Sequence, residues 1–91
     1  MDFRNNAELS RYELMEGDAV VAVADYVERA DSIEIPHTEV DPLLRGRGIG
    51  ADLVRQTLDA VRETGKTVIP TCWFVADFIK ANPSYSDLIA A

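Results

Sequence analysis

The sequence predicts an α+β domain, a mixed sheet flanked by two helices, with elements in the order β-β-β-α-β-α. Residues 11–40 hold three stretches whose apolar side chains alternate or run together as they do in strands. Residues 49–64 and 72–81 instead repeat apolar side chains at helical spacing, and the short apolar segment 66–70 lies between them. This order favours a meander that leads into a right-handed β-α-β crossover with parallel strands.

The first two predicted strands form a hairpin. Tyr12 and Leu14 alternate with polar neighbours, and Gly17-Asp18 supplies a two-residue turn of a favoured type. The run 19–27 that follows is apolar enough for a central strand.

The third predicted strand is "SIEIPHTEV", residues 32–40. Pro36 cannot donate to a strand ladder, so we expect a bulge there or pairing lost on one side. The alternation of this strand places four side chains on one face: Ile33, Ile35, His37 and Glu39.

Glycine and proline mark where the later elements end. Gly65 ends the first helix as a C-terminal cap does, and Pro70 stops the strand that follows. The segment "NPSYSDL" then closes the chain as a turn. The first helix carries one apolar stripe, Ile49, Leu53, Val54, Thr57, Leu58 and Val61, and the second carries Cys72, Val75, Ala76 and Ile79.

Composition bounds the function. With 91 residues, 47% hydrophobic and 27% charged, the chain is expected to form one domain over residues 1–91. The net charge of −7 argues against general nucleic-acid binding, although residues 45–66 are locally basic and suited to a small anion. The longest apolar run, of six residues, is far short of a membrane span. A lone cysteine makes no internal disulfide, so we expect a cytoplasmic, reducing setting. We expect a monomer or a homodimer, since so small a core is compatible with dimerisation.

A glycine-rich turn precedes the first helix, Arg45-Gly46-Arg47-Gly48-Ile49-Gly50. Such a turn leaves backbone N–H groups unpaired, and with the helix dipole they form a site for phosphate or pyrophosphate. The spacing is neither that of a P-loop nor that of a dinucleotide-binding turn. A tight turn with a close helix–strand contact accounts for the glycines equally well.

These six residues match the R/Q-x-x-G-x-G/A signature of the GNAT superfamily of acetyl-CoA-dependent N-acetyltransferases, and they stand where that signature stands, between a strand and a long helix. More specifically, "IPHTEVDPLLRGRGIGADLV" with "VIPTCWFVADFIKANPSY" resembles the small single-domain branch of the superfamily. The resemblance covers residues 8–88. It implies a minimal GNAT fold, acetyl-CoA as co-substrate, no metal, and an amine as acceptor.

The resemblance also implies where acetyl-CoA binds. The glycine-rich turn would cradle the pyrophosphate, and the pantetheine arm would run between the splayed third and fourth strands. The implied cofactor-binding residues are Glu39, Val40, Arg45, Gly46, Arg47, Gly48, Ile49 and Gly50. Two helices and a C-terminal hairpin, which shape the acceptor site in larger relatives, are missing from this sequence, so the acceptor is not identified.

Two residues could carry the chemistry of acetyl transfer. His37 is the only histidine, and an imidazole suits a general base near neutrality; alternatively it only hydrogen-bonds to the backbone. Cys72 starts the second helix, where the dipole favours a thiolate. It would accept the acetyl group or donate a proton to departing CoA, unless it is a small buried hydrophobe, as most lone cysteines are.

Other candidates have plainer explanations. Tyr85 could protonate the thiolate, but packing of the tail onto the core is the favoured interpretation. Arg55 and Arg62 could reach the CoA phosphates, but a solvated helix face is favoured. Three aromatic residues at helical spacing are expected in the core: Trp73, Phe74 and Phe78.

We therefore expect an acetyl-CoA-dependent N-acetyltransferase with an unidentified amine as acceptor, and neither nucleic acid nor membrane as partner. The alternative is a non-catalytic acyl-CoA-binding or interaction module that kept the cofactor cradle. A structural domain with a glycine turn is a third interpretation. The first two predict CoA binding, and only the enzyme predicts transfer that depends on His37 or Cys72.

Overall fold

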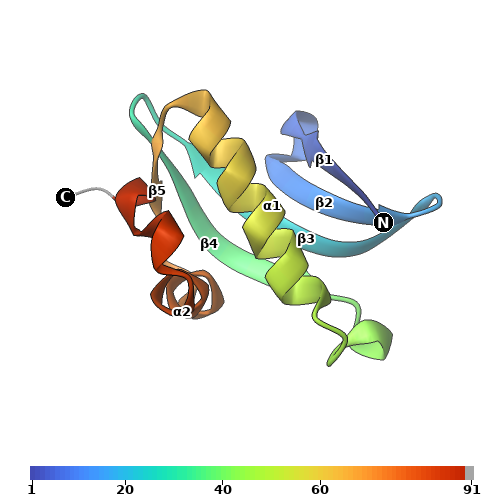
Figure 1. Ribbon diagram of the computed structural model, residues 1–91. Helices are drawn as coiled ribbons and strands as arrows, with labels where there is room; N and C mark the ends of the chain where they lie inside the picture. The colour runs from blue at the N-terminus through green and yellow to red at the C-terminus, as the bar shows by residue number, and fades with distance from the viewer. Residues whose placement is uncertain (90–91) are drawn as a thin grey trace.

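One five-stranded sheet carries the structure, in the order β1-β2-β3-β4-β5 (Figure 1). The computed structural model describes residues 1–89; residues 90 and 91, the end of the predicted domain, lie outside the described residues. The strands are β1 (Asp2–Asn6), β2 (Arg11–Glu16), β3 (Ala19–Glu28), β4 (Ser32–Val40) and β5 (Thr67–Ile69). The helices are α1 (Ile49–Thr64) and α2 (Trp73–Ala81), with 3-10 turns η1 (Ala7–Leu9), η2 (Pro42–Leu44) and η3 (Pro83–Leu88). The predicted α+β class is confirmed.

β1 is a strand that the sequence pattern did not indicate. Its sequence, DFRNN, lacks the apolar alternation of a half-buried strand. It forms by antiparallel pairing with β2, where Phe3 stacks on Tyr12 with ring centroids 5.5 Å apart. Arg4 also pairs with Glu13, at 2.7 Å between Nε and Oε1. Contacts with the neighbouring strand therefore decide this element, and local preference does not.

The remaining strands pair as the predicted meander requires. Gly17, at φ +60°, lies in the turn between β2 and β3, which are antiparallel. β3 and β4 are antiparallel, and β4 and β5 are parallel, with Ser32 opposite Thr67. An isolated bridge joins Val68 to Ile89, just after the 3-10 turn η3 that forms the predicted C-terminal turn.

Pro36 lies at an irregularity in β4, as predicted. Asp25 pairs with His37 whereas Val27 pairs with Glu34, so β4 carries one residue more than β3 over this stretch. The parallel ladder to β5 also ends at Glu34, and no strand of the described chain pairs with that edge of β4 further on. Both expected consequences of the proline occur, a bulge and loss of pairing on one side.

The bulge reverses which residues of β4 face the helices. Ile33 and Ile35 are buried in the core. Beyond the bulge, Thr38 pairs with a buried alanine of β3 and faces the core, whereas His37 and Glu39 lie on the opposite face. The expectation that Ile33, Ile35, His37 and Glu39 share one face is therefore wrong, because one extra residue shifts the alternation by one.

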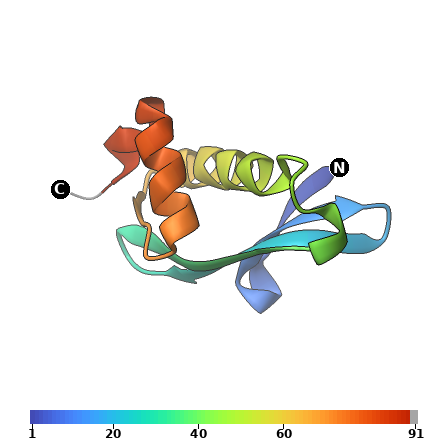
Figure 2. The same ribbon diagram turned by 90° about the horizontal axis from the view of Figure 1, so that it is seen from below.

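Both helices cover the same face of the sheet, and η1 lies on the other face (Figure 2). The predicted stripe of α1 is confirmed, since all six of its residues are buried. Gly65, at φ +77°, ends α1 as predicted, with its N–H donating to the Arg62 carbonyl at 3.1 Å. No helix among residues 1–89 is long and apolar enough to cross a membrane.

Candidate functional site

A cavity of about 690 Å³ lies between the unpaired edge of β4 and the first residues of α1 and α2. We call it the β4 pocket. Its lining comes from residues 36–40 of β4, from the turn and first residues of α1 between 44 and 51, and from residues 71–74. All of the predicted site residues except Arg47 line this pocket. The fold therefore brings together three segments that are far apart in the sequence.

The glycine-rich turn needs glycine for its backbone at two positions. Gly46 and Gly48 have φ values of +83° and +76°, in the left-handed region that side chains disfavour. Gly48 is also the N-cap of α1 and supplies no side chain to cap the first N–H groups. Among the described residues, no hydrogen bond uses the backbone N–H of any residue from 45 to 51. These donors remain available beside the pocket.

Gly50 serves a different purpose. It lies inside α1 with ordinary helical backbone, and a Cβ there would sit 3.1 Å from Cζ of Phe74 and 3.5 Å from Cγ2 of Val40. The missing side chain therefore lets α2 and β4 approach the start of α1. The close helix–strand contact expected of the glycines is found at Gly50, and the open donors that an anion site would need lie at the turn.

The edge of β4 presents backbone groups to the pocket. The N–H of Asp41 donates to the carbonyl of Val21 on β3, at 2.8 Å. Because successive residues of a strand turn their N–H and C=O groups to alternate sides, those of Glu39 also face β3. The groups of Thr38 and Val40 then face the unpaired edge, where β5 no longer reaches.

Cys72 occupies the N-cap of α2 and is buried. Its N–H donates to the Ile35 carbonyl at 3.0 Å, and its Sγ lies 3.6 Å from the Thr38 Oγ1. Burial raises the pKa of the Cys72 thiol, but hydrogen bonding from Thr38 and from the backbone N–H groups of Val75 and Phe74 outweighs it, so that the pKa falls below its ordinary value. The thiol is therefore buried in surroundings that favour its thiolate form.

His37 and Thr38 have different places at the pocket. His37 is exposed on the rim, and its side chain lies on the face of the sheet away from the helices. Thr38 is the residue whose hydroxyl meets Cys72. Nothing in the sequence marked Thr38 as a site residue, because threonine is ordinary in a strand and the bulge alone turns it toward the thiol.

Tyr85 packs the tail onto the core, as favoured. Its hydroxyl donates to Oδ1 of Asp59 at 2.8 Å, and its ring lies 5.8 Å from that of Phe78. The Asp59 carboxylate and partial burial raise the pKa of Tyr85, with burial the larger cause. Tyr85 does not line the β4 pocket.

The arginines of α1 and the aromatic residues of α2 complete the predicted set. Arg55 pairs with Asp52 and Arg62 with Asp87, both on the exposed face of the helix. The expectation of a core position is wrong for Trp73, which is 73% exposed at the pocket and meets Phe74 edge to face. Its side chain therefore lies outside the core.

A five-stranded mixed sheet, a glycine-rich turn into its longest helix and an unpaired strand edge beside that turn define an α+β domain whose pocket is lined by open backbone groups. The sequence model for "GCN5-related N-acetyl-transferase" matches residues 11–88. The chain belongs to the GCN5-related N-acetyltransferase family.

Known proteins are similar to this chain in sequence or in fold. The chain is 38% identical to protein NATD1 of Bos taurus and 35% identical to protein NATD1 of Xenopus tropicalis, over 66 residues or 72% of its length in each case. These matches cover 58% and 60% of the relatives, so the chain spans about three fifths of their length. The solution structure of a GCN5-like protein from Staphylococcus aureus matches with a TM-score of 0.72 at 22% identity, covering 99% of this chain and 88% of that one. This last likeness concerns the fold.

Proposed function

We propose that this protein transfers an acetyl group from acetyl-CoA to an amine. The observation that carries the proposal is the run of unpaired backbone N–H groups from 45 to 51 beside the unpaired edge of β4. The first feature suits the pyrophosphate, because these donors and the positive end of α1 favour an anion. The second suits the pantetheine arm, which carries amide groups that pair with a strand edge.

Within this cradle we assign the pantetheine arm to the backbone groups of Val40 and Thr38. The Glu39 side chain lies at the rim of the β4 pocket. The pyrophosphate lies on the N–H groups of Arg45, Gly46, Arg47, Gly48, Ile49 and Gly50. Arg45 and Arg47 add positive charge, and neither forms an ion pair among residues 1–89. The acetyl thioester then reaches the Thr38–Cys72 end of the pocket.

The chemistry is a direct displacement. The nitrogen lone pair of the acceptor attacks the acetyl carbonyl carbon, the carbon–sulfur bond breaks, and the amine loses a proton to His37. The departing CoA sulfur takes the thiol proton of Cys72, and solvent restores that proton. Proton transfer from a thiol with a lowered pKa to the more basic thiolate of CoA is favourable, which supports Cys72 as the acid.

Two alternatives make different predictions at the same residues. If Cys72 instead accepts the acetyl group, acetyl-CoA without amine leaves a mass increment on the Cys72 peptide. If the domain is a non-catalytic acyl-CoA-binding module, acetyl-CoA binds and no transfer occurs. The position of His37 favours this second function, because His37 is exposed and lies on the other side of β4 from Cys72.

The test combines calorimetric titration with acetyl-CoA and an assay of CoA release with lysyl peptides and polyamines. We expect binding, release that requires amine, and loss of release without loss of binding in Cys72→Ala and His37→Gln. Binding without release for any amine supports the non-catalytic module, and absence of binding overturns both. A single thiol at the site also fits the reducing cytoplasm, where we place the protein.

A further inference from the structure

Side chains continue the contact between β4 and β5 after their backbone ladder ends. The ladder stops at Glu34 opposite Ile69, and Pro70 has no N–H with which to extend it. Thr71 then donates from Oγ1 to Oε2 of Glu34 at 2.9 Å. Nη2 of Arg29 donates to the other carboxylate oxygen, Oε1, at 2.6 Å. Arg29 and then Thr71 hold the pKa of Glu34 below its usual value, so the carboxylate stays ionised as an acceptor.

These contacts bear on Cys72 because Thr71 is its neighbour. The link between β5 and α2 is short, and the N–H of Thr71 donates to the Ile69 carbonyl at 3.1 Å. The N–H of Cys72 is held by Ile35, at 3.0 Å. With the Thr71 hydroxyl fixed on Glu34, the link is held by β4 at two successive residues. The orientation of the Cys72 thiol at the start of α2 depends on this link.

We propose that Glu34 is a positioning residue for Cys72: through Thr71 it holds the turn that aims Sγ at Thr38 and at the first N–H groups of α2. The inference rests on the proposed function for the importance of Cys72, but its geometry stands alone. Arg29 acts one step further out, since it fixes the carboxylate that Thr71 binds.

A positioning role and a charge effect predict opposite shifts. A nearby carboxylate acting only by its charge disfavours a thiolate, so that its removal lowers the thiol pKa. A carboxylate that positions the thiol favours the thiolate, so that its removal raises the thiol pKa. Besides Cys72, the charged or titratable groups that line the pocket are His37, Glu39 and Arg45; α1 and β5 contribute none, and Glu34 lies outside the lining.

The experiment is the pH dependence of Cys72 alkylation by iodoacetamide, followed by intact mass on the full chain. Thr71→Val removes the hydroxyl and keeps the Glu34 charge, and Glu34→Ala removes the acceptor. We expect both to raise the midpoint by roughly half a unit or more. Glu34→Gln retains an acceptor and loses the charge, so its midpoint should stay at or slightly below that of the parent. Thr71→Ser restores a hydroxyl and should restore the midpoint.

Asp87→Ala is the matched control, because it removes another exposed arginine–carboxylate pair, between Arg62 and Asp87, and neither of these side chains forms a hydrogen bond with Arg29, Glu34 or Thr71. It should leave the midpoint unchanged. Equal lowering by Glu34→Ala and Glu34→Gln would overturn the proposal in favour of a simple charge effect, and an unchanged Thr71→Val would overturn it as well. Since Thr71 is exposed, that variant stays informative even if Glu34→Ala does not fold. The readout needs no acetyl-CoA, so failure of the proposed function would appear separately, as absent binding or transfer.

Discussion

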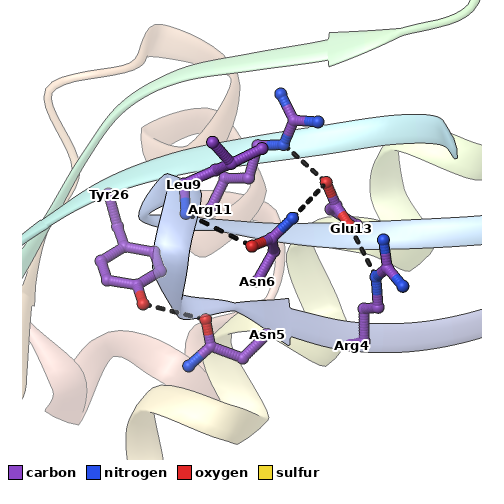
Figure 3. A network of polar contacts seen from close by, with 7 residues as sticks. All are labelled: Arg4, Asn5, Asn6, Leu9, Arg11, Glu13 and Tyr26. Carbon is purple, nitrogen blue, oxygen red and sulfur yellow. Dashed lines mark hydrogen bonds and ion pairs between the residues drawn. The ribbon is translucent and has the colours of Figure 1, made fainter.

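The two faces of the sheet carry two polar clusters with opposite hydrogen-bonding states. On the face without α1 and α2, Glu13 is fully buried, and its carboxylate accepts from Arg4 Nε at 2.7 Å, Arg11 Nε at 2.6 Å and Asn6 Nδ2 at 3.3 Å (Figure 3). On the other face, the β4 pocket adjoins backbone donors from 45 to 51 that have no partner among the described residues. One cluster is saturated and the other is open.

The difference separates a structural role from a binding role. A buried charge with every partner in place stabilises the fold, and adding a ligand there would break bonds. Burial raises the pKa of Glu13, but the hydrogen bonds from Arg4, Arg11 and Asn6 outweigh it and lower the pKa overall. Open donors at a helix start contribute little to stability and are ready for an anion. Variants at the two clusters should therefore separate stability from affinity.

The largest effect is expected at the saturated cluster. Glu13→Gln keeps the shape and removes the charge that two arginines share. Breaking a buried ion pair costs about 3–5 kcal/mol, and the partial exposure of both arginines reduces the expected loss to about 2 kcal/mol. Urea unfolding should show this loss, while acetyl-CoA affinity stays unchanged. A drop in acetyl-CoA affinity at constant stability would mean that the Glu13 cluster takes part in binding.

The pH dependence of that loss has a definite sign. The pKa of Glu13 is lower in the folded chain than in the unfolded one, so its stabilisation is complete above the unfolded value and disappears as pH falls through the folded one. The difference in unfolding free energy between parent and Glu13→Gln should therefore shrink below about pH 4. A difference that holds steady on acidification would contradict the assignment.

The next effect is expected at the open cluster. Gly48→Val places a side chain on a residue with φ +76° and among the open donors. Acetyl-CoA affinity should fall at least about tenfold, which is about 1.4 kcal/mol. Gly17→Val is the matched control: its φ is +60°, it also has no atom within 4 Å of the added Cβ, and it lies in the hairpin turn. Both should lose roughly 1–2 kcal/mol of stability from backbone strain. If Gly48→Val and Gly17→Val bound acetyl-CoA equally well, the glycine-rich turn would not be part of the cofactor site.

Thr57 carries a polar group that belongs to neither cluster. It is buried on α1, and its Oγ1 has no hydrogen-bond partner within residues 1–89, but it does not line the β4 pocket. A buried hydroxyl that has neither a hydrogen-bond partner nor access to a ligand only lowers the stability of the fold. Thr57→Val should therefore raise the unfolding free energy by about 1 kcal/mol. Affinity for acetyl-CoA should not change. A loss of stability on thermal or urea unfolding would mean that the hydroxyl is satisfied after all.

The smallest effect is electrostatic. Arg45 lines the pocket and is exposed, so salt should weaken acetyl-CoA binding only a few-fold between about 50 and 500 mM. Arg45→Gln should flatten this dependence, whereas Arg55→Gln, at an exposed residue already paired with Asp52 and outside the pocket, should not. Calorimetric titration over a salt series measures both. If the affinity of both variants depended equally on salt concentration, Arg45 would have no role in attracting acetyl-CoA.

Sequence reasoning predicted the elements that local signals mark. Gly17, Gly65 and the stripe of α1 determine where the hairpin turns and where the long helix ends. The glycine-rich turn and Cys72 were also predicted, and the structure places both at the β4 pocket. Their chemical roles stay proposals.

Other features had no local signal. β1 exists because β2 offers it an edge and a partner for Arg4, and its own residues do not favour a strand. The same pairing explains why Glu13, polar and on the side away from the helices, is fully buried. Trp73 falls on an apolar helical spacing and is nevertheless exposed. Periodicity shows which side chains lie on the same side of a helix or strand. Which neighbours cover that side depends on the rest of the chain.

By itself, the sequence determined the order of the strands and helices from β2 onward, the parallel final pair of strands and the open backbone ahead of α1, because turns, caps and periodicity act over a few residues. Only the tertiary structure decided that Thr38 meets Cys72. A one-residue bulge at Pro36 changes which side of β4 faces the helices, and the ladder to β5 ends where Glu34 binds Thr71. Both depend on register between strands, and register is set by packing across the sheet, which no single segment specifies.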